Sequence, residues 1–219
     1  MDERAFAGVA GVILLLLIGF LVRLLLVVPF TARKLTGNVN KFKFKSNSNG
    51  QPKLIILLGS GGHTSEMIRI ISQFKEELEN YQSNYIVTSG DGTSVASLHN
   101  FNPNAGVYQL HRARSVHASI SSTIGNTIVS QVESIRLVYK IKPDLLLCNG
   151  PGSCICLALA MLLRRFFTGK GRILYIESAA RVSRLSISGQ LMQLLADRFV
   201  VQWAQLANGR RRECGGLLV

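Results

Sequence analysis

An apolar segment near the N-terminus is the feature that most constrains how this chain can fold. It runs from Ala5 to Val22 without a charged residue, and after Arg23 it continues from Leu24 to Phe30. Spanning a bilayer takes about 20 apolar residues, and the segment reaches that length when Arg23 lies near one interface. The sequence therefore predicts a transmembrane anchor at residues 5–30.

A cleaved signal peptide is the competing interpretation of this segment. It fits poorly, because residues 1–4 are not basic and no small-residue cleavage site follows the apolar run. The next positive charges all lie on the C-terminal side, at Arg33, Lys34, Lys41, Lys43 and Lys45. The positive-inside rule then predicts a lumenal N-terminus at residues 1–4 and a cytosolic body. The same charges can hold a basic polar linker at residues 31–52 against anionic headgroups.

The net charge of the chain indicates the chemistry of its partners. The 219 residues carry a formal charge of +13, which favours nucleic acid, anionic lipid or a phosphate-rich substrate. Nucleic acid is disfavoured, because the sequence has no zinc finger, RNA-recognition aromatic pattern or basic heptad region. Lipid or phosphate chemistry is the interpretation that remains.

The four cysteines indicate neither a disulfide framework nor a metal site. Cys148, Cys154 and Cys156 share one apolar stretch, and Cys214 stands alone near the end. A tetrahedral zinc site needs a second Cys or His pair, which the sequence around Cys154 and Cys156 lacks. We expect buried, reduced thiols in a cytosolic domain and no bound metal.

After the linker, short apolar runs alternate with segments of helical periodicity. Strands are expected at 53–58, 84–88, 144–148, 172–177 and 198–202, and helices at 64–81, 153–167 and 188–196. A further long helix, ended by Pro143, has one apolar face made by Ile120, Ile124, Ile128, Val132, Ile135 and Val138. This alternation predicts a Rossmann-like α/β domain at 53–219, in which helices cover both faces of a parallel sheet. Ligands bind such sheets at the carboxyl ends of the strands.

The expected helix at 153–167 has two interpretations. It is too short to span a bilayer, which favours a buried helix of the α/β fold. Its end, Arg164 to Phe167, reads Arg-Arg-Phe-Phe and could instead rest in the membrane interface.

A glycine-rich loop joins the first strand of the domain to its first helix. Its residues are Gly59, Ser60, Gly61, Gly62, His63 and Thr64. Glycines let the backbone approach a ligand closely, and a helix start offers N–H groups and partial positive charge to phosphate oxygens. The loop is not a P-loop, and Thr64 replaces the third glycine of a dinucleotide fingerprint. It predicts a phosphate or diphosphate site, with a purely structural turn as the alternative.

A second glycine loop follows the strand at 144–148 and again precedes a helix. Its residues are Asn149, Gly150, Pro151, Gly152 and Ser153. Two such loops at one edge of a sheet favour a diphosphate-binding cleft more strongly than either loop alone. A plain strand-to-helix turn is the alternative for the second loop by itself.

His63 and Glu177 are the candidate catalytic residues. His63 could contact a phosphate or act as a base near neutral pH, and a capping or packing histidine is the alternative. Glu177 ends a strand, so its carboxylate is expected at the cleft rim, where it could bind a sugar hydroxyl or accept a proton. An ion pair with Arg181, four residues on, is the structural alternative.

Five spaced motifs, together with the anchor, resemble one family over nearly the whole chain. They are GSGGHTSEM at 59–67, CNGPG at 148–152, YIES at 175–178, RVSRLS at 181–186 and DRFVVQW at 197–203. The family is the membrane-anchoring subunit of the eukaryotic dolichol-pathway UDP-N-acetylglucosamine transferase. That subunit is similar to the N-terminal half of the bacterial lipid II-forming GlcNAc transferase, a GT-B glycosyltransferase.

The resemblance implies that this chain is half of a heteromeric, inverting enzyme and is inactive alone. A separate soluble catalytic subunit would bind the donor UDP-GlcNAc, and this chain would recruit it to the cytosolic face of the endoplasmic reticulum membrane. The pair would add the second GlcNAc to GlcNAc-diphosphate-dolichol during N-glycan precursor synthesis. Gly59, Gly61, Gly62, His63 and Glu177 would lie on the acceptor side, and no metal or other cofactor is expected.

Two other functions are compatible with parts of the sequence. A membrane receptor that localises a catalytic partner, without a reacting group of its own, would have the same anchor and basic linker. A nucleotide-dependent oxidoreductase is disfavoured by Thr64. One segment departs from the family: residues 208–214 are more basic than its usual tail, which affects docking if that tail binds the partner.

Overall fold

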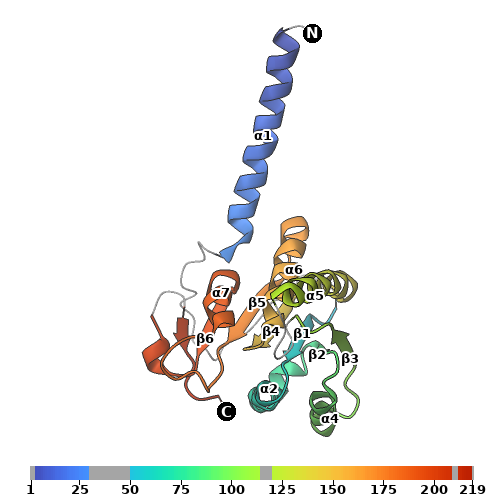
Figure 1. Cartoon of the computed structure of the whole chain (residues 1–219), viewed down its shortest axis with the longest axis vertical. Coiled ribbons are helices and arrows are strands. Elements are labelled where there is room, and N and C mark those ends of the chain that lie inside the picture. Colours follow the sequence, from blue (N-terminus) through green and yellow to red (C-terminus); the bar gives the residue numbers. More distant parts are fainter. Residues whose placement is uncertain (1–2, 30–49, 114–119, 209–211, 219) are drawn as a thin grey trace.

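The computed structural model describes residues 3–29, 50–113, 120–208 and 212–218. A long N-terminal helix, α1 (Glu3–Val27), rises from an α/β domain (Figure 1). Its window Ala10–Val27 has a mean hydropathy of 2.8 and is 6% buried, so α1 is long and apolar enough to cross a membrane. The predicted linker at 31–52 falls almost wholly outside the described residues.

The domain is built on a sheet in which all neighbouring strands of the described residues are parallel. In spatial order these are β3 (Val107–Leu110), β2 (Gln82–Thr88), β1 (Lys53–Leu58), β4 (Leu145–Asn149), β5 (Arg172–Ile176), β6 (Arg198–Val201) and β7 (Arg212–Cys214). The order runs outward in both directions from the central pair, β1 and β4. This is the doubly wound Rossmann arrangement, and it confirms the predicted fold class.

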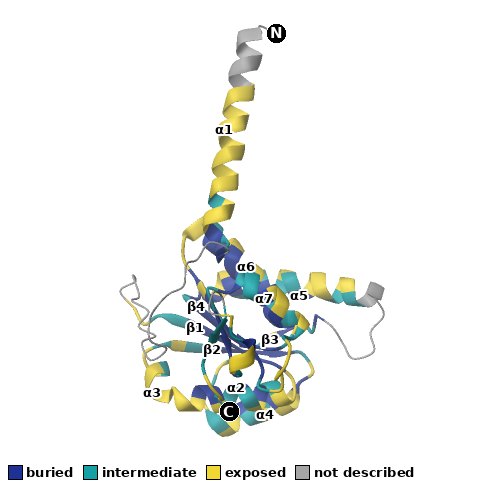
Figure 2. Cartoon of the chain, turned by 90° about the vertical axis from the view of Figure 1, so that its left-hand side faces the viewer, coloured by how far each residue is buried: buried dark blue, intermediate teal, exposed yellow. Residues whose placement is uncertain are grey.

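Helices cover the sheet in two layers (Figure 2). The upper layer, nearer α1, contains α5 (Ile120–Ile141), α6 (Ser153–Thr168) and α7 (Ile187–Leu195). The lower layer contains α2 (Gly62–Gln73), α3 (Lys75–Leu78) and α4 (Gly92–Phe101). Successive strand side chains point to opposite faces, so Ile55 and Leu57 of β1 pack under the upper layer, whereas Leu54 and Ile56 pack against the lower one.

Several elements differ from the sequence prediction. The pattern does not predict α4, β3 or β7, which are short, and β3 has one fully buried residue, Leu110, instead of an apolar run. The helix expected at 64–81 is interrupted at Phe74, where the backbone φ is −115°, and continues as α3. The other predicted strands and helices are present, with ends that differ by a few residues.

Part of the apolar face that the sequence predicts on α5 points away from the core. Ile124 and Ile128 are each 59% exposed and Val132 is 42% exposed. Ser130 and Ser134 are instead completely buried on the side that packs against α6. Small residues let two helices approach closely. The serines share the inner face with Val138 and Ile141, which are buried in the core, whereas Ile124, Ile128 and Val132 point outward.

The lower end of α1 is attached to the C-terminal end of α6. Arg23 Nε donates to the carbonyl of Phe166 (2.9 Å), and Arg165 Nη1 donates to the carbonyl of Val27 (3.1 Å). The rings of Phe20 and Phe166 lie 5.2 Å apart. Arg165 also forms a buried ion pair with Asp197, so this arginine belongs to the fold and is not free to rest in a membrane interface.

Candidate functional site

Two glycine loops meet where the strand order reverses, between β1 and β4. β1 continues through residues 59–61 into α2, below the sheet, and β4 continues through residues 150–152 into α6, above it. Adjacent parallel strands whose helices leave on opposite faces create a crevice at their carboxyl ends. The two loops predicted from the sequence therefore lie at one site.

Gly59 and Gly150 are buried and allow the two loops to pack closely. A Cβ atom on Gly150 would lie 2.2 Å from Cε1 of His63, and one on Gly59 would lie 2.8 Å from Cγ of Pro151. Gly150 also has a φ of +69°, a conformation that favours glycine. These two glycines shape the site and place the His63 ring over the second loop.

Gly61, Gly62 and Gly152 have the opposite environment. All three are exposed, and a Cβ atom on any of them would meet no atom within 4 Å. No side chain caps the N-terminus of α2 or α6, whereas the Asp91 carboxylate caps α4. In the first turns, the N–H groups of Thr64, Cys154 and Ile155 already donate to carbonyls of the preceding loops. An anion would therefore meet the N–H groups at the very start of α2 and α6, next to the exposed Ser60.

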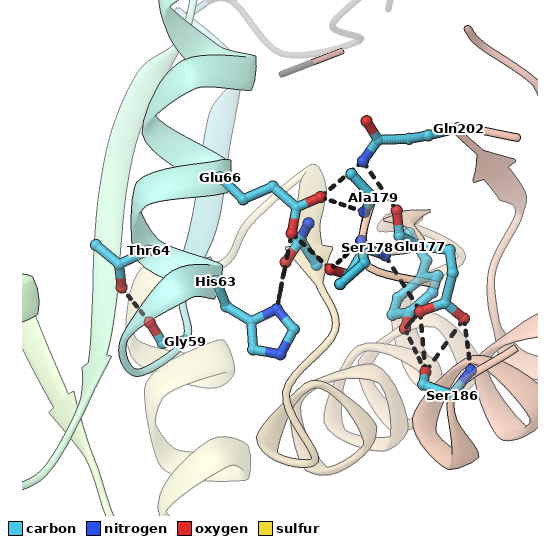
Figure 3. A network of polar contacts seen from close by, with 12 residues as sticks. Gly59, His63, Thr64, Glu66, Glu177, Ser178, Ala179, Ser186 and Gln202 are labelled. Carbon is cyan, nitrogen blue, oxygen red and sulfur yellow. Dashed lines mark hydrogen bonds and ion pairs between the residues drawn. The ribbon is translucent and has the colours of Figure 1, made fainter. Parts of the chain in front are cut away.

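His63 lies in the first turn of α2 and its ring points across the crevice (Figure 3). Its Nδ1 is 3.0 Å from Oδ1 of Asn149, on β4, and 3.9 Å from Oε2 of Glu66. An amide oxygen only accepts hydrogen bonds, so Nδ1 is the donor in this contact, and in the neutral ring the lone pair is on Nε2. The side chain is 36% exposed, so a ligand in the crevice can reach the ring.

Asn149 is 1% exposed and has one unused donor. Its Oδ1 accepts from His63, but its Nδ2 has no hydrogen-bond partner among the described residues. Buried amide groups are normally paired. An unpaired donor beside two open helix N-termini fits a ligand that supplies an acceptor oxygen.

Thr64 does not occupy the position expected of a phosphate-binding side chain. It is 2% exposed, its hydroxyl donates to the carbonyl of Gly59, and its Oγ1 is 2.6 Å from Oγ of Ser94. The backbone N–H of Thr64 donates to the carbonyl of Gly61. We therefore correct the prediction for Thr64: its polar groups hold the loop against α4. Ser153, the first residue of α6, is 5% exposed.

Glu177 also differs from its predicted setting at an open cleft rim. It is completely buried, and Ser186 donates to its carboxylate through both Oγ (2.9 Å to Oε1) and N–H (3.2 Å to Oε2). The Tyr175 hydroxyl, whose pKa is raised by burial, donates a hydrogen bond to Oε1 of Glu177 (3.3 Å). The carboxylate makes these contacts in place of the alternative ion pair with Arg181, an exposed residue. The carboxylate joins β5 to the start of α7, where a Cβ atom on Gly189 would strike it.

Glu66 is a site residue that the sequence reasoning missed. From the first turns of α2 its Oε1 accepts from Ala179 N–H (2.6 Å) and Gln202 Nε2 (2.7 Å), and its Oε2 accepts from Ser178 Oγ (2.8 Å) (Figure 3). It thereby links α2 to the loop after β5 and stands behind His63. Its i+3 spacing from His63 was the available signal.

The cysteines beside the site are free thiols. Cys148, Cys154 and Cys156 are buried and Cys214 is exposed, as the sequence predicted for the first three. Burial raises the pKa of the Cys154 thiol well above its usual range. Within the described residues, no three His, Cys, Asp or Glu side chains are grouped so that they could hold a metal ion.

Comparison with known proteins identifies the family. The family model described as oligosaccharide biosynthesis protein Alg14 like matches residues 54–218, which contain nearly the whole sheet. The chain belongs to the Alg14 family. This finding confirms the resemblance that the five sequence motifs indicated.

Relatives in the Alg14 family match this chain over most of their length. UDP-N-acetylglucosamine transferase subunit ALG14 of Debaryomyces hansenii is 39% identical over 95% of this chain and 96% of its own. The Mus musculus protein of the same name is 36% identical over 70% of this chain and 76% of its own. The Saccharomyces cerevisiae protein of the same name is 29% identical over 97% of this chain and 99% of its own.

Solved structures similar to this Alg14-family chain show its fold. MurG of Acinetobacter baumannii has a TM-score of 0.58 at 13% identity, with 74% of this chain matched to 45% of that one. A putative UDP-N-acetylglucosamine 2-epimerase of Listeria monocytogenes has a TM-score of 0.54 at 16% identity, with 71% of this chain matched to 40% of that one. The chain therefore has the fold of less than half of either protein, which agrees with the predicted GT-B half-domain.

Proposed function

We propose that this chain is the membrane-anchoring, acceptor-side subunit of the UDP-GlcNAc transferase that adds the second GlcNAc to GlcNAc-diphosphate-dolichol. The reaction belongs to N-glycan precursor synthesis. The names of its Alg14 relatives, which are UDP-N-acetylglucosamine transferase subunits, support this activity.

The observation that carries the proposal is the pair of open helix N-termini at the strand-order reversal. Gly62 and Gly152 leave space for an anion at the starts of α2 and α6, and Asn149 adds an unused buried donor. Each helix N-terminus carries roughly half a positive charge, so two of them suit the two phosphates of a diphosphate. The acceptor diphosphate would bind here through backbone N–H groups.

His63 is the residue that we propose as the base. In an inverting transfer the acceptor hydroxyl attacks the anomeric carbon of GlcNAc, the new C–O bond forms, and the bond to UDP breaks with its electron pair leaving on the phosphate oxygen. Nε2 of His63 accepts the hydroxyl proton, and the resulting imidazolium is stabilised by Asn149 at 3.0 Å and Glu66 at 3.9 Å. Glu177 supports the site through its hydrogen bonds and is not our choice of base.

The donor side of the cleft is proposed to come from a separate soluble subunit that binds UDP-GlcNAc. The match to MurG covers 45% of that chain, which supports a second half supplied by a partner. The word subunit in the names of the relatives supports the same assembly. We further propose that α1 holds the complex in the endoplasmic reticulum membrane with the domain in the cytosol, because the basic residues follow the anchor.

The test of the diphosphate site is Gly62→Ala in the full chain assembled with its soluble partner. The added methyl group meets open space and no positive φ, so folding is retained while close approach of the acceptor is blocked. Gly92→Ala is the matched control, because Gly92 is also an unhindered first residue of a helix. We expect transfer to fall at least tenfold in Gly62→Ala, the equivalent of about 1.4 kcal/mol, and not in Gly92→Ala.

Unchanged transfer in Gly62→Ala, with normal recruitment of the partner, would contradict the acceptor site. It would instead favour the receptor function, in which this chain localises the catalytic subunit without binding the reacting lipid.

A further inference from the structure

Gln202 is a buried amide at the carboxyl end of β6 that joins three distant segments of the chain. It is 4% exposed. Its Nε2 donates to Oε1 of Glu66 (2.7 Å) and to the carbonyl of Glu177 (3.1 Å), and its Oε1 accepts from the N–H of Leu218 (3.0 Å). A carboxylate only accepts and an N–H only donates, so these partners fix the orientation of the amide. Both donor hydrogens and the acceptor oxygen of Gln202 are therefore in use.

Glu66 is held between this amide and His63 (Figure 3). Its Oε1 accepts from Gln202 and from the N–H of Ala179 (2.6 Å), and its Oε2 lies 3.9 Å from Nδ1 of His63. The carbonyl of Ala179 in turn accepts from Nε1 of Trp203 (2.7 Å), the residue after Gln202. Gln202 and Trp203 thus hold the carboxylate from the end of β6, both directly and through Ala179.

The backbone of Leu218, near the C-terminus, also contacts the far end of α2. Nε2 of Gln73, the last residue of that helix, donates to the carbonyl of Leu218 (2.8 Å). Gln73 is seven positions from Glu66, about two turns, so both lie on one side of α2. Leu218 is therefore bound twice, by Gln202 near the start of the helix and by Gln73 at its end. Of these two glutamines, Gln202 is the one that donates to Glu66.

We propose that Gln202 is a positioning residue for the transfer reaction, which fixes the Glu66 carboxylate against His63. The inference rests on the proposed role of His63 as the base. When Nε2 of His63 takes the hydroxyl proton, the ring becomes a cation. A carboxylate that is held in place near Nδ1 stabilises this cation more than one that is free to turn away. Gln202 is buried, so it acts through Glu66 and not on the substrate.

The test is a double-mutant cycle in the full chain assembled with its soluble partner. Gln202→Met removes the donor to Glu66 and keeps the length of the side chain. Transfer is measured against the concentration of each substrate for the parent, Gln202→Met, His63→Ala and the double variant. We expect Gln202→Met to lower kcat about tenfold with KM unchanged, because the lost interaction stabilises a cation that forms only during the reaction. In the His63→Ala chain the same substitution should lower kcat no further.

Gln73→Met is the matched control. It also removes a glutamine donor that binds Leu218, but at the exposed end of α2, about two turns from Glu66. We expect Gln73→Met to keep the parental kcat. If Gln202 served only to hold the C-terminal residues in place, both variants would lose the same share of kcat, and that result would overturn the inference.

Two further results would overturn the inference and leave the base in place. They are a parental kcat in Gln202→Met, and an equal loss from Gln202→Met in both backgrounds when His63→Ala is itself slow. A parental rate in His63→Ala would instead contradict the proposed base, so the two failures are distinguishable.

Gln202→Glu replaces Gln202→Met if the latter does not assemble with the partner. It has nearly the same shape and still offers Leu218 an acceptor, but as a carboxylate it has no donor for Glu66. The same loss of kcat is expected in Gln202→Glu, again absent in the His63→Ala background. A parental kcat in Gln202→Glu would overturn the inference.

Discussion

Gly150 determines where the His63 ring can lie. Because it has no side chain, the imidazole rests over the backbone of the second loop and reaches Asn149, a contact between residues 86 positions apart. The glycine motifs predict both loops, but the sequence does not reveal that Gly59 and Gly150 pack while Gly61, Gly62 and Gly152 stay open. That division depends on tertiary contacts between the loops, as do the roles of Glu66 and Glu177.

The role of His63 as a base predicts a large kinetic effect. His63→Ala in the assembled complex should lower the transfer rate by roughly 10²–10⁴-fold, because general base catalysis typically contributes that much. His99→Ala, at an exposed histidine on α4, is the control and should keep the parental rate. A parental rate in His63→Ala, with the complex intact, would remove His63 from the chemistry.

The buried position of Glu177 predicts an effect on stability. Glu177→Gln converts an acceptor-only carboxylate into an amide, which places an NH₂ group against the donors of Ser186. The free energy of unfolding should fall by about 1.5–3 kcal/mol, measured by denaturant titration in detergent micelles. Glu76→Gln, on the exposed side of α3, should be neutral. Loss of transfer without loss of stability would show that Glu177 acts in the reaction.

Among the elements, long buried strands were predictable and short or half-buried ones were not. β1 and β4 are continuous apolar runs, whereas β3 and β7 have few buried residues and gain their structure from pairing with β2 and β6. α5 shows the limit of helical periodicity. Its spacing correctly predicts a helix, but spacing does not reveal that Ile124, Ile128 and Val132 are exposed whereas Val138, on the same predicted face, is buried.

The inverted packing of α5 predicts opposite responses on its two sides. Ser134→Leu should overpack the contact with α6 and lower the free energy of unfolding by about 1–3 kcal/mol. Val132→Leu adds one methylene group on the exposed side, where no neighbour is overpacked, and should change the free energy of unfolding little. Thermal unfolding in detergent micelles measures both. A stable Ser134→Leu together with a destabilised Val132→Leu would mean that the apolar face is the inner one.

At the scale of the whole molecule, the sequence predicts an anchor followed by a Rossmann-like domain, and the structure has a long apolar helix followed by such a domain. The attachment of α1 to α6 was not predictable, because it depends on backbone carbonyls of Val27, Arg165 and Phe166 that any sequence supplies. Net charge indicated lipid or phosphate chemistry without saying where it acts.

The assembled enzyme is expected to work without a resident metal ion. In our account the charge of the acceptor diphosphate is balanced by the N-termini of α2 and α6, so no divalent cation is needed on this side of the cleft. Treatment of the complex with a chelator should leave the transfer rate unchanged. Loss of activity that is restored by a divalent cation would show that the diphosphate site is incomplete.

The most direct test of the account is a transfer assay with UDP-GlcNAc and a GlcNAc-diphosphate-lipid acceptor. It compares this chain in vesicles, the soluble UDP-GlcNAc-binding subunit, and the two together. We predict transfer in the mixture alone, because each chain supplies one side of the cleft. Absence of GlcNAc transfer in all three samples, with the complex demonstrably formed, would contradict the central claim that this chain is half of a glycosyltransferase.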